Sequence, residues 1–216
     1  TGTGAAVYHS YTYGGPYTAT LPVTDSGGKT DTDTVGVTVT GPLPPVTVSL
    51  IVSNGTNDLK ETVSTGAVTN GGGLVFGKDA LNAMRFTGVA VPQGATIRKA
   101  YLKVYPGTGL TNSIRIAYSA EASNNSAAIA AVTRALSLIP KTTAVVETPP
   151  AYTSAMYNQT ADFASVVQQV VNRSGWVSGN AMTIFVADSG SAAARNGKRY
   201  NSAAAKAPML GIEYTP

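Results

Sequence analysis

Short runs in which apolar and polar residues alternate recur along almost the whole chain of 216 residues. A period of two places every second side chain on the same face of an extended strand, so each run predicts a strand with one buried face. Glycine and proline, which number 23 and 12, separate the runs and are typical of turns. The runs lie at residues 17–24, 34–40, 46–52, 97–105, 114–118, 182–186 and 210–214.

One segment has a helical period instead. Its apolar residues fall at i, i+3, i+4, i+7 and i+8, which is the spacing of one helix face. They are Phe163, Val166, Val167, Val170 and Val171. We therefore expect an amphipathic helix within residues 162–172, with Asp162 as N-cap and Gly175 just beyond its end. The alanine-rich stretch 127–136 predicts a further short helical turn.

The strongest break in the sequence is Gly41-Pro42-Leu43-Pro44-Pro45, because proline fixes φ and donates no backbone hydrogen bond. It predicts a small domain over residues 1–41, a proline-rich linker over 42–45 and a larger domain over 46–216. In the small domain, two alternating runs flank Asp25-Ser26-Gly27-Gly28, a strong turn signal, and predict a hairpin. In the larger domain, many short strands predict an all-β, jelly-roll-like β-sandwich that carries the one short helix.

Composition argues against several classes of partner. The net charge is +4 and the basic residues are scattered, so nucleic acid is not expected. No apolar stretch reaches the roughly 18 to 20 residues of a membrane span, so membrane insertion is not expected. The chain has no cysteine, which argues against a disulfide scaffold and a thiolate zinc site. Only 12% of residues are charged, and uncharged polar residues take their place, as is common on secreted β-proteins.

Catalysis is the function class with the weakest support. The single histidine, His9, is expected to pack at the start of a strand. The chain contains no nucleophile elbow, zinc-protease motif or phosphate-binding loop, and its 11 acidic residues lie mostly in turns or near strand ends. We therefore expect a protein that is not an enzyme.

The N-terminal block resembles the second half of a PKD domain, an immunoglobulin-like module of extracellular prokaryotic proteins. The motifs that carry the resemblance are His9-Ser10-Tyr11, residues 15–17 (GPY), residues 21–25 (LPVTD) and residues 33–39 (DTVGVTV). The resemblance implies a partial immunoglobulin-like β-sandwich. The half of the PKD domain that precedes these motifs has no counterpart in this sequence.

The second block resembles DNRLRE-type domains, β-sandwich modules attached to secreted polysaccharide-active enzymes and large surface proteins. Four motifs carry the resemblance, and they span most of the block. They are residues 84–89 (MRFTGV), 91–102 (VPQGATIRKAYL), 170–181 (VVNRSGWVSGNA) and 207–214 (APMLGIEY). The resemblance implies an extracellular or cell-surface location in a prokaryote, and either carbohydrate binding or a structural role. Trp176 lies in the third motif and is expected to anchor the core.

Oxygen ligands for a metal are candidates at Asp58, Glu61 and Glu213. In many jelly rolls the first and last strands are neighbours and share a structural Ca²⁺, which prefers such carboxylates. Lys60 places a positive charge between the first two, and no calcium-loop motif occurs. A solvated turn is the alternative, and it is the one that the sequence favours.

Carbohydrate binding is a hypothesis for Tyr101, Lys103 and Tyr105, which share one face of the strand predicted at 97–105. Aromatic rings stack on sugar rings, and polar groups bind the hydroxyls. Tyr152, Tyr157 and Tyr200 lie in segments that resemble loops. The alternative is that Tyr101 and Tyr105 pack beneath the helix or against a second layer.

Self-assembly is the other functional hypothesis, and it rests on the first block. A half sandwich exposes an apolar face and unpaired strand edges, and isolated hairpins are marginally stable in water. The apolar face is expected to contain Tyr17, Leu21, Val35, Val37 and Val39. If Thr1 is a mature N-terminus, strands from another copy or from a neighbouring surface-protein domain would complete the sandwich. A fragment of a longer protein is the equal alternative.

Two function classes follow. The first is a non-catalytic structural or adhesive subunit of an extracellular filament or surface layer, joined by β-strand complementation. The second is a carbohydrate-binding accessory module of a larger secreted enzyme, with polysaccharide as its partner. The charge-poor sequence and the half domain favour the first class.

Overall fold

The structure is a computed structural model that describes residues 8–216. The chain divides into two compact units, one that ends at Pro45 and one that comprises Val46–Tyr214. No helix within the described residues is both long and apolar enough to cross a membrane.

The first unit is built on one antiparallel hairpin, of β1 (Gly15–Thr24) and β2 (Thr30–Val39). Asp25 forms the turn, because its carboxylate accepts hydrogen bonds from the backbone N–H groups of Gly27 (2.8 Å) and Lys29 (2.9 Å). The predicted hairpin is therefore present, with β2 beginning four residues earlier than its apolar pattern suggested.

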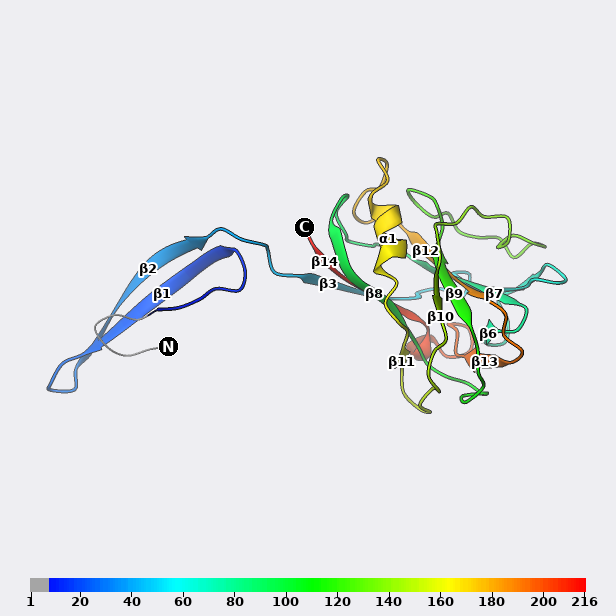
Figure 1. Ribbon diagram of the computed structural model, residues 1–216, viewed down its shortest axis with the longest axis horizontal. Helices are drawn as coiled ribbons and strands as arrows, with labels where there is room; N and C mark the ends of the chain where they lie inside the picture. The colour runs from blue at the N-terminus through cyan, green and yellow to red at the C-terminus, as the bar shows by residue number, and fades with distance from the viewer. Residues whose placement is uncertain (1–7) are drawn as a thin grey trace. The chain divides into compact units, whose positions relative to one another are not determined.

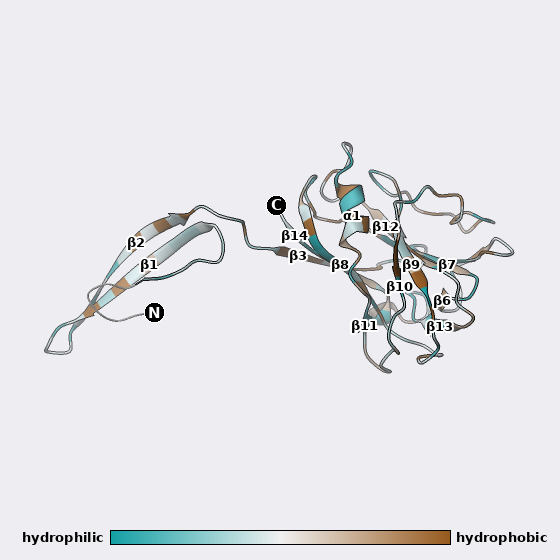
Figure 2. Ribbon diagram, in the orientation of Figure 1, coloured by the Kyte–Doolittle hydropathy of each residue, from teal (hydrophilic) through white to brown (hydrophobic). Residues whose placement is uncertain are grey.

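The register of the hairpin separates two chemically different faces. Tyr17 lies opposite Val37 and Ala19 opposite Val35, so apolar side chains from both strands share one face. Thr20 lies opposite Thr34 on the other face, which is rich in threonine. Figure 2 shows the resulting alternation of hydrophobic and paler residues along both ribbons. Leu21, Val23 and Val35 are 63%, 56% and 60% exposed, so the apolar face is largely open within this unit.

The second unit contains two large antiparallel sheets and a two-stranded ribbon (Figure 1). The six-stranded sheet has the order β10 (Val145–Glu147), β9 (Ile116–Ala120), β12 (Met182–Asp188), β7 (Ala80–Phe86), β4 (Asp58–Thr62), β5 (Ala67–Thr69). The four-stranded sheet has the order β11 (Asn158–Gln159), β8 (Thr96–Val104), β14 (Met209–Thr215), β3 (Val46–Ile51). The ribbon pairs β6 (Leu74–Gly77) with β13 (Ala194–Gly197). This arrangement confirms the prediction of an all-β sandwich with one short helix.

The core of the second unit forms from the inward face of each sheet. Met84 and Ile184 lie opposite each other in the six-stranded sheet, and Leu102 and Ile212 come from the four-stranded sheet; all four are fully buried in one hydrophobic cluster. The alternation predicted from the sequence places Leu102, Ile184 and Ile212 on the inward faces. The strand neighbours of Leu102 on the outer face, Tyr101 and Lys103, are polar, whereas Phe185 beside Ile184 joins a second apolar cluster. Burial of apolar surface between the sheets is the main stabilising contribution.

Helix α1 (Ala164–Val171) adds its apolar face to the same core. Phe163 occupies the N-cap position predicted for Asp162 and makes no side-chain hydrogen bond there, while the Asp162 carboxylate accepts the N–H groups of Ala164 (2.8 Å) and Ala100 (2.9 Å). Asp162 therefore joins the start of the helix to β8. Trp176, after the helix, is 2% exposed and donates its indole N–H to the Val91 carbonyl at 2.9 Å, which confirms it as a core anchor.

A smaller cluster covers the outer face of the six-stranded sheet. Leu59, Leu81 and Phe185 pack there against Leu136, which belongs to the alanine-rich segment between β9 and β10. That segment forms turns rather than the helical turn that we predicted, and Arg134 within it has a φ of 58°. Its role is to shield this second apolar surface from water.

The tryptophan anchor gives a stability prediction. We expect Trp176→Ala to lower the free energy of unfolding by about 3–5 kcal/mol, because it removes a large buried side chain. Trp176→Phe should cost less, because it keeps most of the packing and loses the hydrogen bond to Val91. The neighbouring Val177 is 61% exposed and supplies the control, Val177→Ala. Urea unfolding measures the stability of the three variants. Equal losses of free energy of unfolding for Trp176→Ala and Val177→Ala would contradict the assignment of Trp176 as a core anchor.

Candidate functional site

Strand β8 presents the sequence-predicted sugar-binding residues on the outer face of the four-stranded sheet. Leu102 and Val104 point into the core, with 0% and 1% exposure. Alternation then places Tyr101, Lys103 and Tyr105 on the opposite side, where all three are partly exposed. These residues therefore lie neither in the core between the sheets nor in a fully buried second layer.

Tyr101 is supported by the neighbouring strand β14. A side chain at Gly211 would collide with the Tyr101 ring, since an added Cβ would lie 2.4 Å from its nearest atom. The absence of that side chain lets the ring lie against the backbone of β14. The ammonium groups of Lys99 and Lys103 lie 5.5 Å and 5.7 Å from the ring centroid, within the range of a cation–π contact.

Tyr105 belongs to a second aromatic group on the same unit. Its ring makes an edge-to-face contact with Tyr157, with centroids 5.5 Å apart, and the Lys206 ammonium lies 4.4 Å from its centroid. The Tyr157 hydroxyl donates to the Ala207 carbonyl at 3.0 Å, which fixes that ring. Burial, together with the Tyr105 hydroxyl, raises the pKa of Tyr157 above its ordinary value. We use the name tyrosine face for the set Tyr101, Tyr105, Tyr157, Lys99, Lys103 and Lys206.

Three of these residues escaped sequence reasoning as site residues. Tyr157 was placed in a loop, and nothing in its spacing indicated that it meets Tyr105. Lys206 precedes β14 and has no periodic signal. Lys99 does share the two-residue spacing of Tyr101 and Lys103, and that spacing could have identified it. The other loop tyrosines lie elsewhere: Tyr152 packs under the buried Arg195, and Tyr200 against the core.

The three carboxylates considered as metal ligands are not brought together. Asp58 and Glu61 lie on β4, three residues apart, so their side chains point to opposite faces of the six-stranded sheet. Glu213 lies on β14 in the four-stranded sheet. Among residues 8–216, no group of three histidine, aspartate or glutamate side chains is placed to hold a metal ion.

Glu61 has a structural role instead. It is fully buried and accepts hydrogen bonds from the backbone N–H groups of Leu136 (2.9 Å) and Ser137 (3.0 Å). The Ser137 hydroxyl also contacts this carboxylate. Glu61 therefore holds the covering segment against the outer face of the six-stranded sheet.

Asp58 lies on the inner side of β4 near the buried Arg199. One of its oxygens accepts the N–H of Tyr200 at 2.6 Å, while Oδ1 has no hydrogen-bond partner among the described residues. Burial raises the pKa of Asp58 from 3.8 to about 6, although the Tyr200 N–H and the Arg199 charge oppose the rise. Arg199 is itself fully buried and donates to the carbonyls of Thr69 and Gly71 at 3.3 Å and 3.0 Å.

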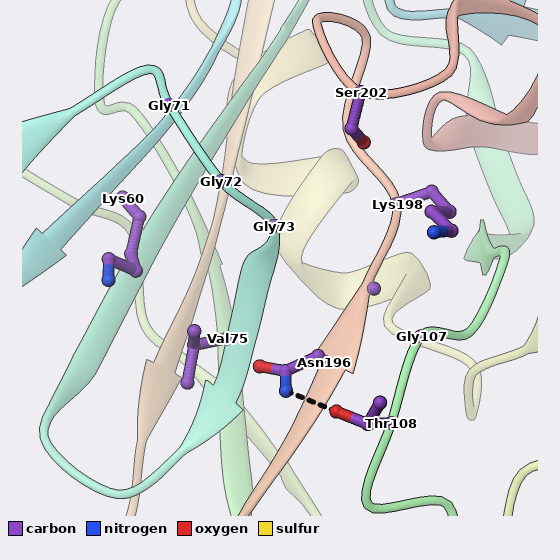
Figure 3. Close-up of a pocket in the computed structure, with 11 residues that line it drawn as sticks. Lys60, Gly71, Gly72, Gly73, Val75, Gly107, Thr108, Asn196, Lys198 and Ser202 are labelled. Atoms are coloured by element: carbon purple, nitrogen blue, oxygen red, sulfur yellow. Dashed lines mark hydrogen bonds between the residues drawn. The ribbon is translucent and has the colours of Figure 1, made fainter.

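A cleft of about 470 Å³ opens beside this pair (Figure 3). It is bounded by β4, by the loop between β5 and β6, by β13, and by the loops that follow β8 and β13. Its lining residues are Lys60, Gly71, Gly72, Gly73, Val75, Gly107, Thr108, Asn196, Gly197, Lys198 and Ser202. The Asn196 side chain donates to the Thr108 hydroxyl at 2.6 Å, and the Gly107 N–H donates to the Asn196 carbonyl at 2.7 Å.

Glycine forms much of the cleft because the backbone segments approach closely. A Cβ at Gly73 would lie 2.9 Å from the Gly197 carbonyl oxygen, and a Cβ at Gly197 would lie 2.7 Å from the Phe76 ring. Gly72 has a φ of +70°, and a Cβ there would meet no atom within 4 Å. The wall at residues 71–73 thus presents backbone rather than side chains. This cleft was not anticipated from the sequence.

Comparison with known proteins identifies no family for the chain. No family model matches it, and no curated protein matches it. The solved structures that match include a chain described by the words "Structural basis for the promiscuous specificity of the carbohydrate-binding modules from the beta-sandwich super family". The two chains are 11% identical with a TM-score of 0.27, and the match covers 96% of this chain and 75% of that one. The resemblances to PKD and DNRLRE-type domains stay predictions.

The raised pKa of Asp58 predicts a pH dependence of stability. The folded protein disfavours the ionised carboxylate, so the stability that Asp58 contributes is fully present below pH 3.8 and is lost as pH rises through about 6. The difference between the two pKa values corresponds to up to about 3 kcal/mol.

The measurement is urea unfolding from pH 3.5 to pH 8 for the protein and for Asp58→Asn, which can still accept the Tyr200 N–H. We expect the variant to gain stability relative to the original chain as pH rises. If the free energy of unfolding changed with pH in the same way in both proteins, the pKa of Asp58 would not be raised by folding.

Proposed function

We propose that this protein is a non-catalytic, secreted carbohydrate-binding protein, and that its second unit binds polysaccharide through the tyrosine face. The observation that carries the proposal is the ring of Tyr101, which lies on the outer face of the four-stranded sheet, against Gly211 and between two lysines. Aromatic rings in such positions provide apolar surface for sugar rings, and ammonium groups can donate hydrogen bonds to sugar hydroxyls.

The tyrosine face suits an extended ligand better than a single sugar. Tyr105 directly follows the last residue of β8 and lies four residues after Tyr101, which corresponds to roughly 13 Å of extended chain. A chain of several sugar rings can contact both, whereas a monosaccharide can contact only one. The contacts of Tyr105 with Tyr157 and Lys206 hold its ring in place before a ligand arrives, which lowers the entropy cost of binding.

The first test compares Tyr101→Ala and Tyr105→Ala with Tyr101→Phe and Tyr105→Phe. We expect each alanine variant to lower affinity for a polysaccharide ligand by about tenfold, because one stacking surface is lost. The phenylalanine variants keep the ring and should keep most of the affinity. Affinity electrophoresis in gels that contain a panel of polysaccharides measures the effect, with Tyr13→Ala in the first unit as a control. Retardation that is unchanged in the alanine variants would refute the proposed site.

The first unit supports a second candidate function, self-association. Tyr17, Leu21, Val35, Val37 and Val39 lie on one face of the hairpin, as the register places them. Leu21 and Val35 are each at least 60% exposed, and a two-stranded hairpin is marginally stable by itself in water. We infer that another copy of the chain, or a neighbouring surface-protein domain, covers this face by adding strands to the free edges of β1 and β2. Such contacts would make the protein a filament or surface-layer subunit.

The test of self-association compares a lysine substitution on the apolar face of the hairpin with one on the threonine face. Val35→Lys places a charge on the apolar face, opposite Ala19, and should abolish association, because burying an unpaired charge is costly. Thr20→Lys places the same charge on the threonine face and should leave association through the apolar face intact. Sedimentation velocity measures the size of each variant over a range of concentrations. A protein that stays monomeric at all concentrations would exclude this function for the isolated chain.

A further inference from the structure

The glycine-rich cleft has the chemistry of an anion site. Lys60 and Lys198 both line it, and none of the described residues in its lining is aspartate or glutamate. Figure 3 draws Lys60 on one side of the segment 71–73 and Lys198 on the other. Two ammonium groups that share a cleft without a lining carboxylate create a positive potential at which a negatively charged group is stabilised.

The buried residues behind the cleft leave that potential in place. Asp58 contributes negative charge on the inner side of β4, but the guanidinium of Arg199 lies close enough to counteract it. Arg199 donates to the Gly71 carbonyl, so its positive charge lies directly behind the glycine segment. The buried pair is therefore close to neutral in sum, and the two lysines determine the sign of the charge at the cleft.

The remaining lining groups are hydrogen-bonding groups of the kind that recognise sugar hydroxyls. They are the Asn196 amide, the Thr108 hydroxyl and the backbone of the glycines, whereas the Ser202 hydroxyl already donates to the Arg199 carbonyl at 3.0 Å. Asn196 is oriented by its bond to Thr108, which fixes the positions of both groups. A volume of about 470 Å³ falls within the range of small-molecule sites.

The cleft is joined to the tyrosine face through the end of β8. The Lys198 N–H donates to the Tyr105 carbonyl at 2.8 Å, and Tyr105 is followed by Pro106 and by Gly107 of the cleft wall. One backbone hydrogen bond therefore joins Lys198, which lines the cleft, to Tyr105, which belongs to the tyrosine face.

We propose that the glycine-rich cleft binds the anionic substituent of an acidic sugar, a uronate carboxylate or a sulfate ester, through Lys60 and Lys198. The inference deepens the proposed carbohydrate-binding function and rests on it: the ligand class becomes acidic polysaccharide. Asn196 and Thr108 bind the hydroxyls of the same sugar.

The test uses pairs of polymers that differ in charge. Affinity electrophoresis of the whole chain compares polygalacturonate with highly methyl-esterified pectin, and dextran sulfate with dextran. We expect the acidic member of at least one pair to bind about tenfold more tightly, and the double variant Lys60→Gln/Lys198→Gln to remove that preference. The pair in which the preference occurs distinguishes carboxylate from sulfate.

The control is Lys29→Gln/Lys78→Gln, which changes net charge equally but lies outside the cleft lining. Loss of the preference in both double variants would assign it to net charge and overturn the inference, as would a preference that survives in the cleft variant. Tyr101→Ala should weaken both members of each pair, because it acts on the tyrosine face.

A separate measurement covers the case in which no polymer binds and the proposed function fails. Galacturonate, glucose 6-sulfate and galactose are titrated into the protein, and the backbone amide signals of Gly72, Gly73 and Gly107 are followed by NMR. Shifts with either acidic sugar and none with galactose would support the cleft as an anion site by itself. No shift with any of the three would overturn the inference.

Discussion

The burial of one apolar face of β8 between the two sheets determines most of what the second unit presents to solvent. Ala100, Leu102 and Val104 are at most 1% exposed, and a one-residue shift of the strand would move all of them to the surface. The same constraint holds Tyr101 and Tyr105 outward with a fixed spacing. The outward positions of Tyr101 and Tyr105 therefore depend on the core, whereas Tyr157 and Lys206 reach Tyr105 from segments outside the strands.

Buried polar groups connect the loops to this framework. Glu61 holds the covering segment at Leu136 and Ser137, and Asp58 holds the loop at Tyr200. Arg195, 2% exposed, donates to the carbonyls of Asn112, Pro149 and Pro150 and so fixes two long connections. Each of these bonds satisfies backbone groups that would be costly to bury alone. The glycine-rich cleft lies beside Asp58 and Arg199, and it is lined by the loop between β5 and β6 and by the loop that follows β13.

The sequence predicted the elements that repeat with a regular period. The hairpin, the core strands β8, β12 and β14 and the single helix follow from alternation, helical spacing and turn residues, all of which are local. The core strand β7 was not predicted as an alternating run, and the burial of Trp176 was inferred from the motif that follows the helix. The tyrosine face was predicted in part, because Tyr101, Lys103 and Tyr105 share one strand. Tyr157 and Lys206 were missed, since their contacts with Tyr105 join positions about 50 and 100 residues away along the chain. The metal hypothesis did not rest on a strand or helix period, and the structure places Asp58 and Glu61 on opposite faces of β4.

The most direct test of the central claim, that the outer face of the four-stranded sheet binds polysaccharide, is a crystal structure of the whole chain with an oligosaccharide that it retains. We expect a sugar ring stacked on Tyr101, with further rings extending along β8 toward Tyr105. A ligand bound at another surface, with Tyr101 and Tyr105 untouched, would contradict it.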